Sequence, residues 1–141
     1  MLRIVLDTSV IVAALRSRFG AGNAVLRHVA AGEFVPLVTP ALFLEYEEVL
    51  KRPEQRQVHG LNADQLDRFL AALASACEPV EIHFQWRPQL NDPADEMVLE
   101  AAINGRADAL VTYNIRDFRE AARRFRLQVI SPATLLQEIE R

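Results

Sequence analysis

Four acidic residues in well-separated parts of the chain stand where carboxylates could act together: Asp7, Glu45, Asp95 and Asp117. Each follows an expected strand or lies toward the inward side of an expected helix, where an unpaired charge is costly. Carboxylates brought close together repel one another unless a cation neutralises them. A site of carboxylate oxygens without histidine or thiolate suits a hard divalent ion, Mg²⁺ or Mn²⁺. The acids therefore predict a metal site, provided that the fold brings them together.

The first acid ends the N-terminal apolar run. Residues 2–6 predict a buried strand, and a helix is expected after Asp7. Ligands of open parallel sheets bind at the carboxyl ends of strands, which is where Asp7 stands. Two interpretations stay open from sequence: a functional carboxylate at a strand end, or a side chain that caps the following helix.

Helical periodicity separates the second acid from its neighbours. In the helix expected over residues 41–50, one apolar stripe carries Leu42, Tyr46, Val49 and Leu50. Glu45 falls at the edge of this stripe. Glu47 and Glu48 point outward, each four residues before a basic residue, as in solvated ion pairs.

The same projection applies to the helix expected over residues 94–104. It turns Asp95 toward the inward stripe, together with Met97, Val98, Ala101 and Ala102, whereas Glu96 and Glu100 are expected to face solvent. Asp92 is the expected N-cap. Asp92 and Asp95 could also serve only the helix dipole.

The fourth acid follows the apolar strand expected at residues 109–112. Taken alone, Asp117 could be a turn or helix-cap aspartate. If the strands that end at Asp7 and Thr112 are neighbours, however, all four acids converge on one edge of the sheet.

The remaining elements indicate an α/β fold with a mostly parallel sheet, because strands and helices alternate with short connections. Further strands are expected at residues 34–38, 127–130 and, less clearly, 79–82. Further helices are expected at residues 23–31, after Thr39-Pro40 up to Arg52-Pro53, from a capping box at Asn62 to about Cys77, and after Ser131-Pro132.

Composition fits one compact domain over residues 1–141. Half of the residues are apolar and the net charge is −3, which disfavours disorder and a generally basic nucleic-acid binder. Cys77 is the only cysteine, and the three histidines lack zinc-site spacing. No membrane span or signal peptide is expected, so we expect a cytoplasmic protein.

The motifs around these acids resemble those of the PIN-domain ribonucleases, especially the VapC-like toxins of bacterial toxin–antitoxin pairs. The matching segments are Leu6-Asp7-Thr8-Ser9-Val10, residues 45–53 from Glu45 to Pro53, Asp92-Pro93-Ala94-Asp95-Glu96 with Ala101-Ala102, and residues 111–118 from Val111 to Phe118. The resemblance covers essentially the whole chain.

The resemblance implies a three-layer α/β/α fold and metal-dependent endonucleolytic hydrolysis of RNA, leaving a 5′-phosphate and a 3′-hydroxyl. It implies Asp7, Glu45, Asp95 and Asp117 as catalytic and metal-binding residues, with Ser9, Thr112 and Asn114 in support. Many relatives carry an aspartate in place of Asn114, so Asn114 and Asp117 remain alternatives for the fourth metal contact. A cognate antitoxin and a homodimer are further implications.

Arginines concentrate around Asp117: Arg116, Arg119, Arg123, Arg124 and Arg126. They could bind RNA phosphates, dock an acidic stretch of an antitoxin, or form a solvated helix face. Trp86 could stack on a base, although a packed tryptophan is the simpler interpretation. Because Asn114 departs from the more acidic pattern, a catalytically weak PIN-like module that binds RNA or protein is the main alternative to the enzyme.

Overall fold

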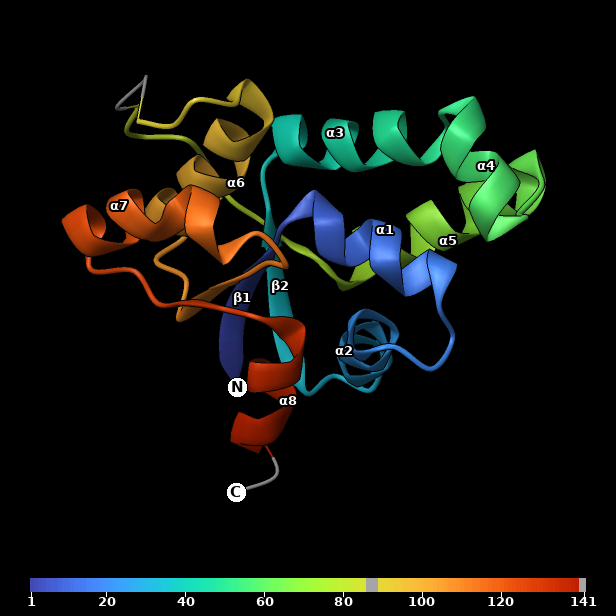
Figure 1. The fold of residues 1–141 in the computed structure, drawn as a ribbon, viewed down its shortest axis with the longest axis horizontal. Helices are drawn as coiled ribbons and strands as arrows, with labels where there is room; N and C mark the ends of the chain where they lie inside the picture. The colour runs from blue at the N-terminus through green and yellow to red at the C-terminus, as the bar shows by residue number, and fades with distance from the viewer. Residues whose placement is uncertain (86–88, 140–141) are drawn as a thin grey trace.

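Five short parallel strands form the sheet, and helices flank it, as the sequence predicts (Figure 1). The computed structural model describes residues 1–85 and 89–139. The strands are β1 (Leu2–Leu6), β2 (Phe34–Val38), β3 (Glu78–Pro79), β4 (Ala109–Val111) and β5 (Val129–Ile130). The helices are α1 (Thr8–Arg16), α2 (Ala21–Ala30), α3 (Pro40–Leu50), α4 (Pro53–His59), α5 (Ala63–Ala76), α6 (Pro93–Asn104), α7 (Ile115–Phe125) and α8 (Pro132–Ile139).

The strand order is β3-β2-β1-β4-β5, so β1 lies in the centre and the chain crosses from one side of it to the other between β3 and β4. Leu6 at the end of β1 is in register with Val111 at the end of β4. The Asp7 backbone N–H donates to the Val111 carbonyl at 2.9 Å. The strands that precede Asp7 and Thr112 are therefore neighbours, which meets the condition on which the expected convergence of the acids depended. This is the switch point of the sheet, where open α/β folds form a crevice.

Local sequence explains most helix starts. Proline occupies the first turn of α3, α4 and α6, where its missing N–H costs nothing. The Thr39 hydroxyl accepts a hydrogen bond from Leu42 N at 3.1 Å. Asn62 and Gln65 form the predicted reciprocal capping box, with bonds of 2.8 and 2.9 Å. These caps fix where the helices begin and so place the acids of α3 and α6 relative to the sheet.

Several elements differ from the sequence expectation, among them β5, which begins two residues later than expected. Pro53 ends α3 but also starts α4, a helix that the sequence analysis missed, closed by Gly60 at a φ of 69°. β3 is shorter than the expected 79–82 and begins one residue earlier. α2 starts at Ala21, so that Gly22 lies inside it; a Cβ on Gly22 would be only 3.1 Å from the Val10 carbonyl oxygen, and the glycine lets α2 approach α1 closely.

The expectation that Glu96 and Glu100 face solvent is wrong. Both are buried, with 4% and 7% of their surface exposed, and Met97, expected inward, is only partly buried. A single-face projection assumes that one side of the helix meets water. α6 instead contacts α3, α7 and three strands, β1, β2 and β4, so little of its surface remains free. Surface pairing on α3 is as predicted, since Glu47 and Glu48 lie within 3.5 and 3.2 Å of Lys51 and Arg52.

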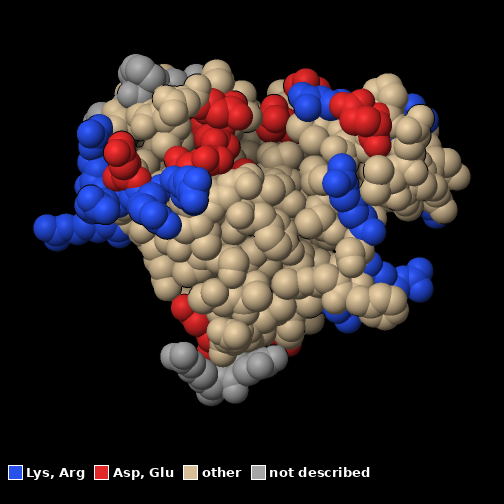
Figure 2. Space-filling model, viewed as in Figure 1, with Lys and Arg blue, Asp and Glu red and all other residues tan. Residues whose placement is uncertain are grey.

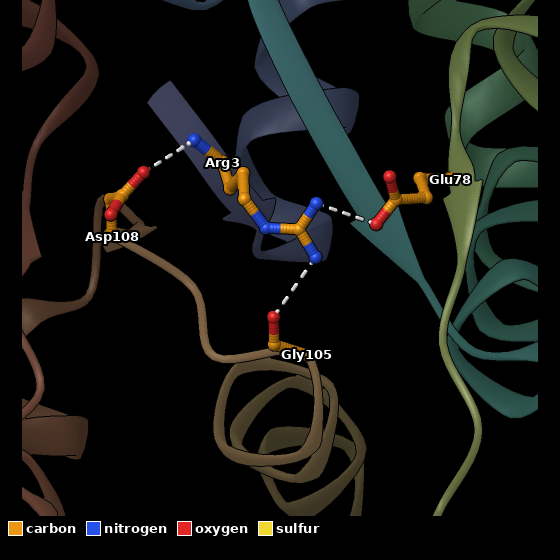
Figure 3. Close-up of polar contacts among 4 residues, drawn as sticks. All are labelled: Arg3, Glu78, Gly105 and Asp108. Carbon is orange, nitrogen blue, oxygen red and sulfur yellow. Dashed lines mark hydrogen bonds and ion pairs between the residues drawn. The ribbon is translucent and has the colours of Figure 1, made fainter. Parts of the chain in front are cut away.

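Arg3 ties several elements together at the amino-terminal end of the sheet, away from the switch point (Figure 3). Its guanidinium lies 2.7 Å from the Glu78 carboxylate and donates to the Gly105 carbonyl at 3.1 Å, where α6 ends. Its backbone N–H donates to Asp108 at 2.8 Å. One side chain thus joins β1, β3 and the end of α6.

Trp86, which the sequence analysis considered as a base-stacking or packed residue, lies outside the described residues. Within the described ranges, no helix is long and apolar enough to span a bilayer. Cys77 is partly buried against the core, and burial raises the pKa of its thiol to about 11.

Candidate active site

Asp7 is a buried carboxylate at the carboxyl end of β1, with 4% of its surface exposed. Its side chain does not cap α1. The hydroxyls of Ser9 and Thr112 each donate a hydrogen bond of 2.7 Å to the same oxygen, Oδ2. Of the two interpretations that the sequence left open, the capping side chain is therefore wrong. Because both bonds fall on Oδ2, Oδ1 stays available to another ligand.

A short polar network holds this carboxylate in place. Thr112 is fully buried, and its hydroxyl oxygen accepts from Asn114 N at 2.8 Å. The Ser9 hydroxyl oxygen accepts from Tyr113 N at 3.3 Å. Next to Asp7, the Thr8 hydroxyl is a buried oxygen without a hydrogen-bond partner among the described residues. The network orients Asp7 and leaves one unsatisfied polar group beside it.

Glu45 reaches the site from α3, and its neighbour Tyr46 anchors that helix. The buried Tyr46 hydroxyl donates to the carbonyl of Leu6 at 2.5 Å, immediately before Asp7. Partial burial raises the pKa of Glu45, and the charges of Glu48, Asp92 and Asp7 raise it further against the opposing effect of Arg52. The influence of Asp7 and Asp92 indicates that Glu45 faces the same acidic region.

Asp95 is the most perturbed of the exposed or partly exposed acids. It lies in the first turn of α6, and burial together with the charges of Asp7, Asp92, Asp117 and Glu96 raises its pKa to about 6. A helix N-terminus alone would favour the charged form. The opposite shift shows that burial and the neighbouring carboxylates together outweigh the helix dipole.

Asp92, in contrast, fulfils the capping role that the sequence allowed. Its Oδ1 accepts from Ala94 N at 2.9 Å. Its charge nevertheless acts on both Glu45 and Asp95. Asp92 thus belongs to the acidic region while one of its oxygens is engaged at the helix end.

Sequence analysis missed the role of Glu96. This buried carboxylate accepts the backbone N–H groups of Gln89 and Leu90 at 2.5 and 2.6 Å. The Gln89 side chain in turn accepts from Arg124 of α7. Glu96 therefore holds the loop at 89–92 over the start of α6. No periodicity signal reveals this, because the partners are backbone groups of an irregular segment.

α7 brings the fourth acid. Asp117 lies exposed in the first turn of this helix, and Asn114 precedes it at the N-cap position without a side-chain cap bond. Asp92, Asp95 and Asp117 line a hollow of about 550 Å³ together with Arg116, Arg119, Glu120 and residues 89–91. Of Asn114 and Asp117, only Asp117 carries a charge that acts on Asp95. The structure thus brings Asp7, Glu45, Asp95 and Asp117 into one electrostatic neighbourhood.

Charges segregate on this face of the molecule (Figure 2). Acidic atoms gather over α6 and the start of α3, and a basic patch lies beside them over α7. Among residues 1–85 and 89–139, no carboxylate forms an ion pair with Arg116, Arg119 or Arg123, whereas Arg3, Lys51, Arg52 and Arg68 are all paired. Arg116, Arg119 and Arg123 are therefore available to meet an external anion.

The donor set suits a hard cation in its chemistry. Oxygen ligands predominate, and an unpartnered Thr8 hydroxyl adjoins Asp7. The pKa of Asp95 is raised by burial and by neighbouring carboxylates, and a bound cation would offset both effects. As the side chains lie, no group of three or more His, Cys, Asp or Glu residues in the described ranges is close enough to hold an ion. Inward movement of partly exposed acids such as Glu45 and Asp95 would be needed.

Comparisons with known proteins concern the family and the fold. The family model for the PIN domain matches residues 3–116, which contain three of the four predicted site acids, all except Asp117. No curated protein matches the chain. A chain in the crystal structure of VapBC2 from Rickettsia felis bound to a DNA fragment from their promoter has a similar fold. It is 19% identical, with a TM-score of 0.59, and the match covers 92% of this chain and 98% of that one. The family match spans most of the sequence, and the chain belongs to the PIN-domain family.

Proposed function

We propose that this protein is a metal-dependent endoribonuclease that hydrolyses phosphodiester bonds, and that it acts as the toxin of a type II toxin–antitoxin pair. The observation that carries the proposal is the convergence of carboxylates around Asp95. Burial and the charges of three neighbouring aspartates raise the pKa of Asp95 to about 6. Acids that repel one another in the absence of a cation are typical of a divalent-metal site.

Asp7, Glu45 and Asp95 would hold Mg²⁺ or Mn²⁺, and Asp117 would bind it or orient the attacking water. When bound, such an ion lowers the pKa of a coordinated water and neutralises charge that develops on the scissile phosphate. The hydroxyls of Ser9 and Thr112 both donate to Oδ2 of Asp7 and so fix the orientation of this carboxylate. Its other oxygen, Oδ1, would face the ion. Asn114 supports the network through its backbone N–H rather than its side chain.

The arginine patch supports an anionic substrate. Arg116 and Arg119 line the same hollow as Asp95 and Asp117, so an anion bound there meets both signs of charge. Guanidinium groups pair well with phosphate oxygens. Arg123 and Arg124 extend the basic surface along α7. RNA phosphates are the ligands that we assign to this patch.

An antitoxin partner and a homodimer are the further parts of the proposal. The structural neighbour was determined as the VapBC2 complex, which supports a search for a cognate partner protein. Co-purification with the product of an adjacent gene, followed by light scattering of the isolated protein and of the complex, tests both points.

The deciding experiment is cleavage of end-labelled transfer RNA and of a generic single-stranded RNA in Mg²⁺ or Mn²⁺. We expect cleavage that EDTA and the Asp7→Asn substitution abolish. Asp64→Asn, which removes an exposed carboxylate at the start of another helix, should leave it intact. Cleavage that survives both EDTA and Asp7→Asn would refute the metal site.

A second candidate is a PIN-like module that binds RNA or protein with little catalysis. Two observations favour this module. Asn114 stands in place of an acid, and the carboxylates of the described residues lie too far apart to enclose an ion. Calorimetric titration with Mn²⁺ separates the two. Micromolar binding that is lost in Asp95→Asn supports the nuclease, whereas RNA binding without metal binding or cleavage supports the module.

A further inference from the structure

Tyr113 is an exposed aromatic residue fixed beside the acidic site. It lies between Thr112 and Asn114 at the carboxyl end of β4, and 47% of its surface is exposed. Its backbone N–H donates to the Ser9 hydroxyl at 3.3 Å, and that hydroxyl donates to Asp7 at 2.7 Å. Two hydrogen bonds thus connect Tyr113 to the central carboxylate.

The phenol is held at its other end as well. Its hydroxyl oxygen accepts from the backbone N–H of Gly22 at 3.0 Å. Gly22 lies in the first turn of α2, whose N-cap residue, Gly20, has no side chain to satisfy such a group. Capping explains the position of the hydroxyl, but it does not require an aromatic ring that remains about half exposed.

Anchored at the backbone and at the hydroxyl, the ring loses little further freedom when a ligand covers it. Aromatic side chains recognise single-stranded RNA by stacking on unpaired bases, and stacking tolerates any base because each has a π face. Arg116, three residues later, lines the acidic hollow and can take a phosphate. A base on Tyr113 and a phosphate near Arg116 would then both lie close to the acids.

We propose that Tyr113 is a stacking platform for one base of a single-stranded RNA close to the scissile phosphate. The inference rests on the proposed function and adds a contact that fixes the register of the strand. Tyr113 would act on substrate binding and positioning, while the carboxylates carry out the chemistry.

Two substitutions separate the ring from the hydroxyl. Tyr113→Phe keeps the ring and loses the Gly22 bond, whereas Tyr113→Ala loses both. We would measure binding of a fluorescent single-stranded RNA by anisotropy with all variants in an Asp95→Asn background, which we expect not to cleave. Tyr113→Phe should bind within about threefold of the parent, and Tyr113→Ala about 5- to 150-fold more weakly, the range expected for loss of one stacked base. Phe19→Ala, which removes a 93% exposed ring from the turn between α1 and α2, should have no effect.

A single abasic nucleotide, moved along the RNA, identifies the stacked base. At one position, the abasic nucleotide should weaken RNA binding by the parent as much as the Tyr113→Ala substitution does. The same abasic RNA should bind to Tyr113→Ala no more weakly than the intact RNA does. In the cleaving protein, Tyr113→Ala should raise KM with a smaller change in kcat.

Several results would overturn the inference. Equal RNA affinity of Tyr113→Ala and the parent would leave Tyr113 as a helix cap only, with the proposed nuclease intact. Equal losses in Tyr113→Phe and Tyr113→Ala would assign the effect to the hydroxyl, and additive losses with every abasic position would exclude stacking. A wild-type protein that neither cleaves RNA nor binds it would refute the proposed function together with this inference.

Discussion

Neutralising one carboxylate of the acidic site should make the metal-free protein more stable. In Asp95 the pKa rises from its ordinary value of 3.8 to about 6, through burial and the nearby charges of Asp7, Asp92 and Asp117. At pH 7.5 the group is ionised in both folded and unfolded chains, but ionisation costs more in the folded one. The shift corresponds to at most about 3 kcal/mol. Asp95 is only partly buried, so solvent screening reduces this to about 1–2 kcal/mol.

We therefore expect Asp95→Asn to raise the free energy of unfolding by about 1–2 kcal/mol in EDTA at pH 7.5. The folded chain binds the proton more tightly, so the penalty disappears as pH falls below the folded pKa toward the unfolded one. At pH 4.5 the gain should be about one third of its value at pH 7.5. Urea unfolding followed by circular dichroism at both pH values measures this difference.

Magnesium should reverse the order of stability. Metal bound at 100 times its dissociation constant adds about 2.7 kcal/mol to the wild-type protein and little to Asp95→Asn. Asp64→Asn is the matched control, because it removes an exposed aspartate from the first turn of α5 with no acidic cluster around it. That control should lose a few tenths of a kcal/mol in both buffers. An Asp95→Asn protein that is less stable than wild type in EDTA would refute the reasoning about repulsion.

Three further substitutions test separate features of the structure. Thr112→Val removes one of the two hydroxyl donors to Asp7 and should lower cleavage or metal affinity about 10- to 100-fold, measured by initial rates and by Mn²⁺ titration. Glu96→Ala should destabilise by about 2–4 kcal/mol and speed hydrogen exchange in the loop at 89–92, whereas Glu96→Gln, which keeps the accepting oxygen, should restore most of the protection. Arg3→Ala should cost about 1–2 kcal/mol in urea unfolding yet leave the cleavage rate unchanged, because its contacts lie at the other end of the sheet; a large loss of activity would show that the two ends are coupled.

The parts of the fold that the sequence predicted correctly are those governed by local pattern. Apolar runs that end in Asp7 and Thr112 indicated two strands, and the rule for parallel sheets placed their ends together, which the structure confirms. Thr39 and Asn62 were predicted correctly as the N-caps of α3 and α5, with Pro40 at the first helical position of α3.

What failed depended on tertiary surroundings. Glu96 was assigned to the surface because helical periodicity does not show that a loop and two helices cover the outer side of α6. α4 was missed because Pro53 was interpreted only as an end. The anchored ring of Tyr113 had one visible sign, an aromatic residue directly at the end of a strand, but its partner Gly22 is 91 positions away.

The central hydrogen bond of the site joins residues 105 positions apart, Asp7 near the start of the chain and Thr112 near its end. Synthesis by the ribosome therefore completes the site late. A growing chain that exposes Asp7 and Glu45 still lacks β4, Thr112 and the acid of α7, and without β4 the end of β1 has lost one of its two neighbouring strands. Under the proposed function, this order of assembly would keep the nascent chain inactive on the ribosome until the segment from β4 to α7 has been translated.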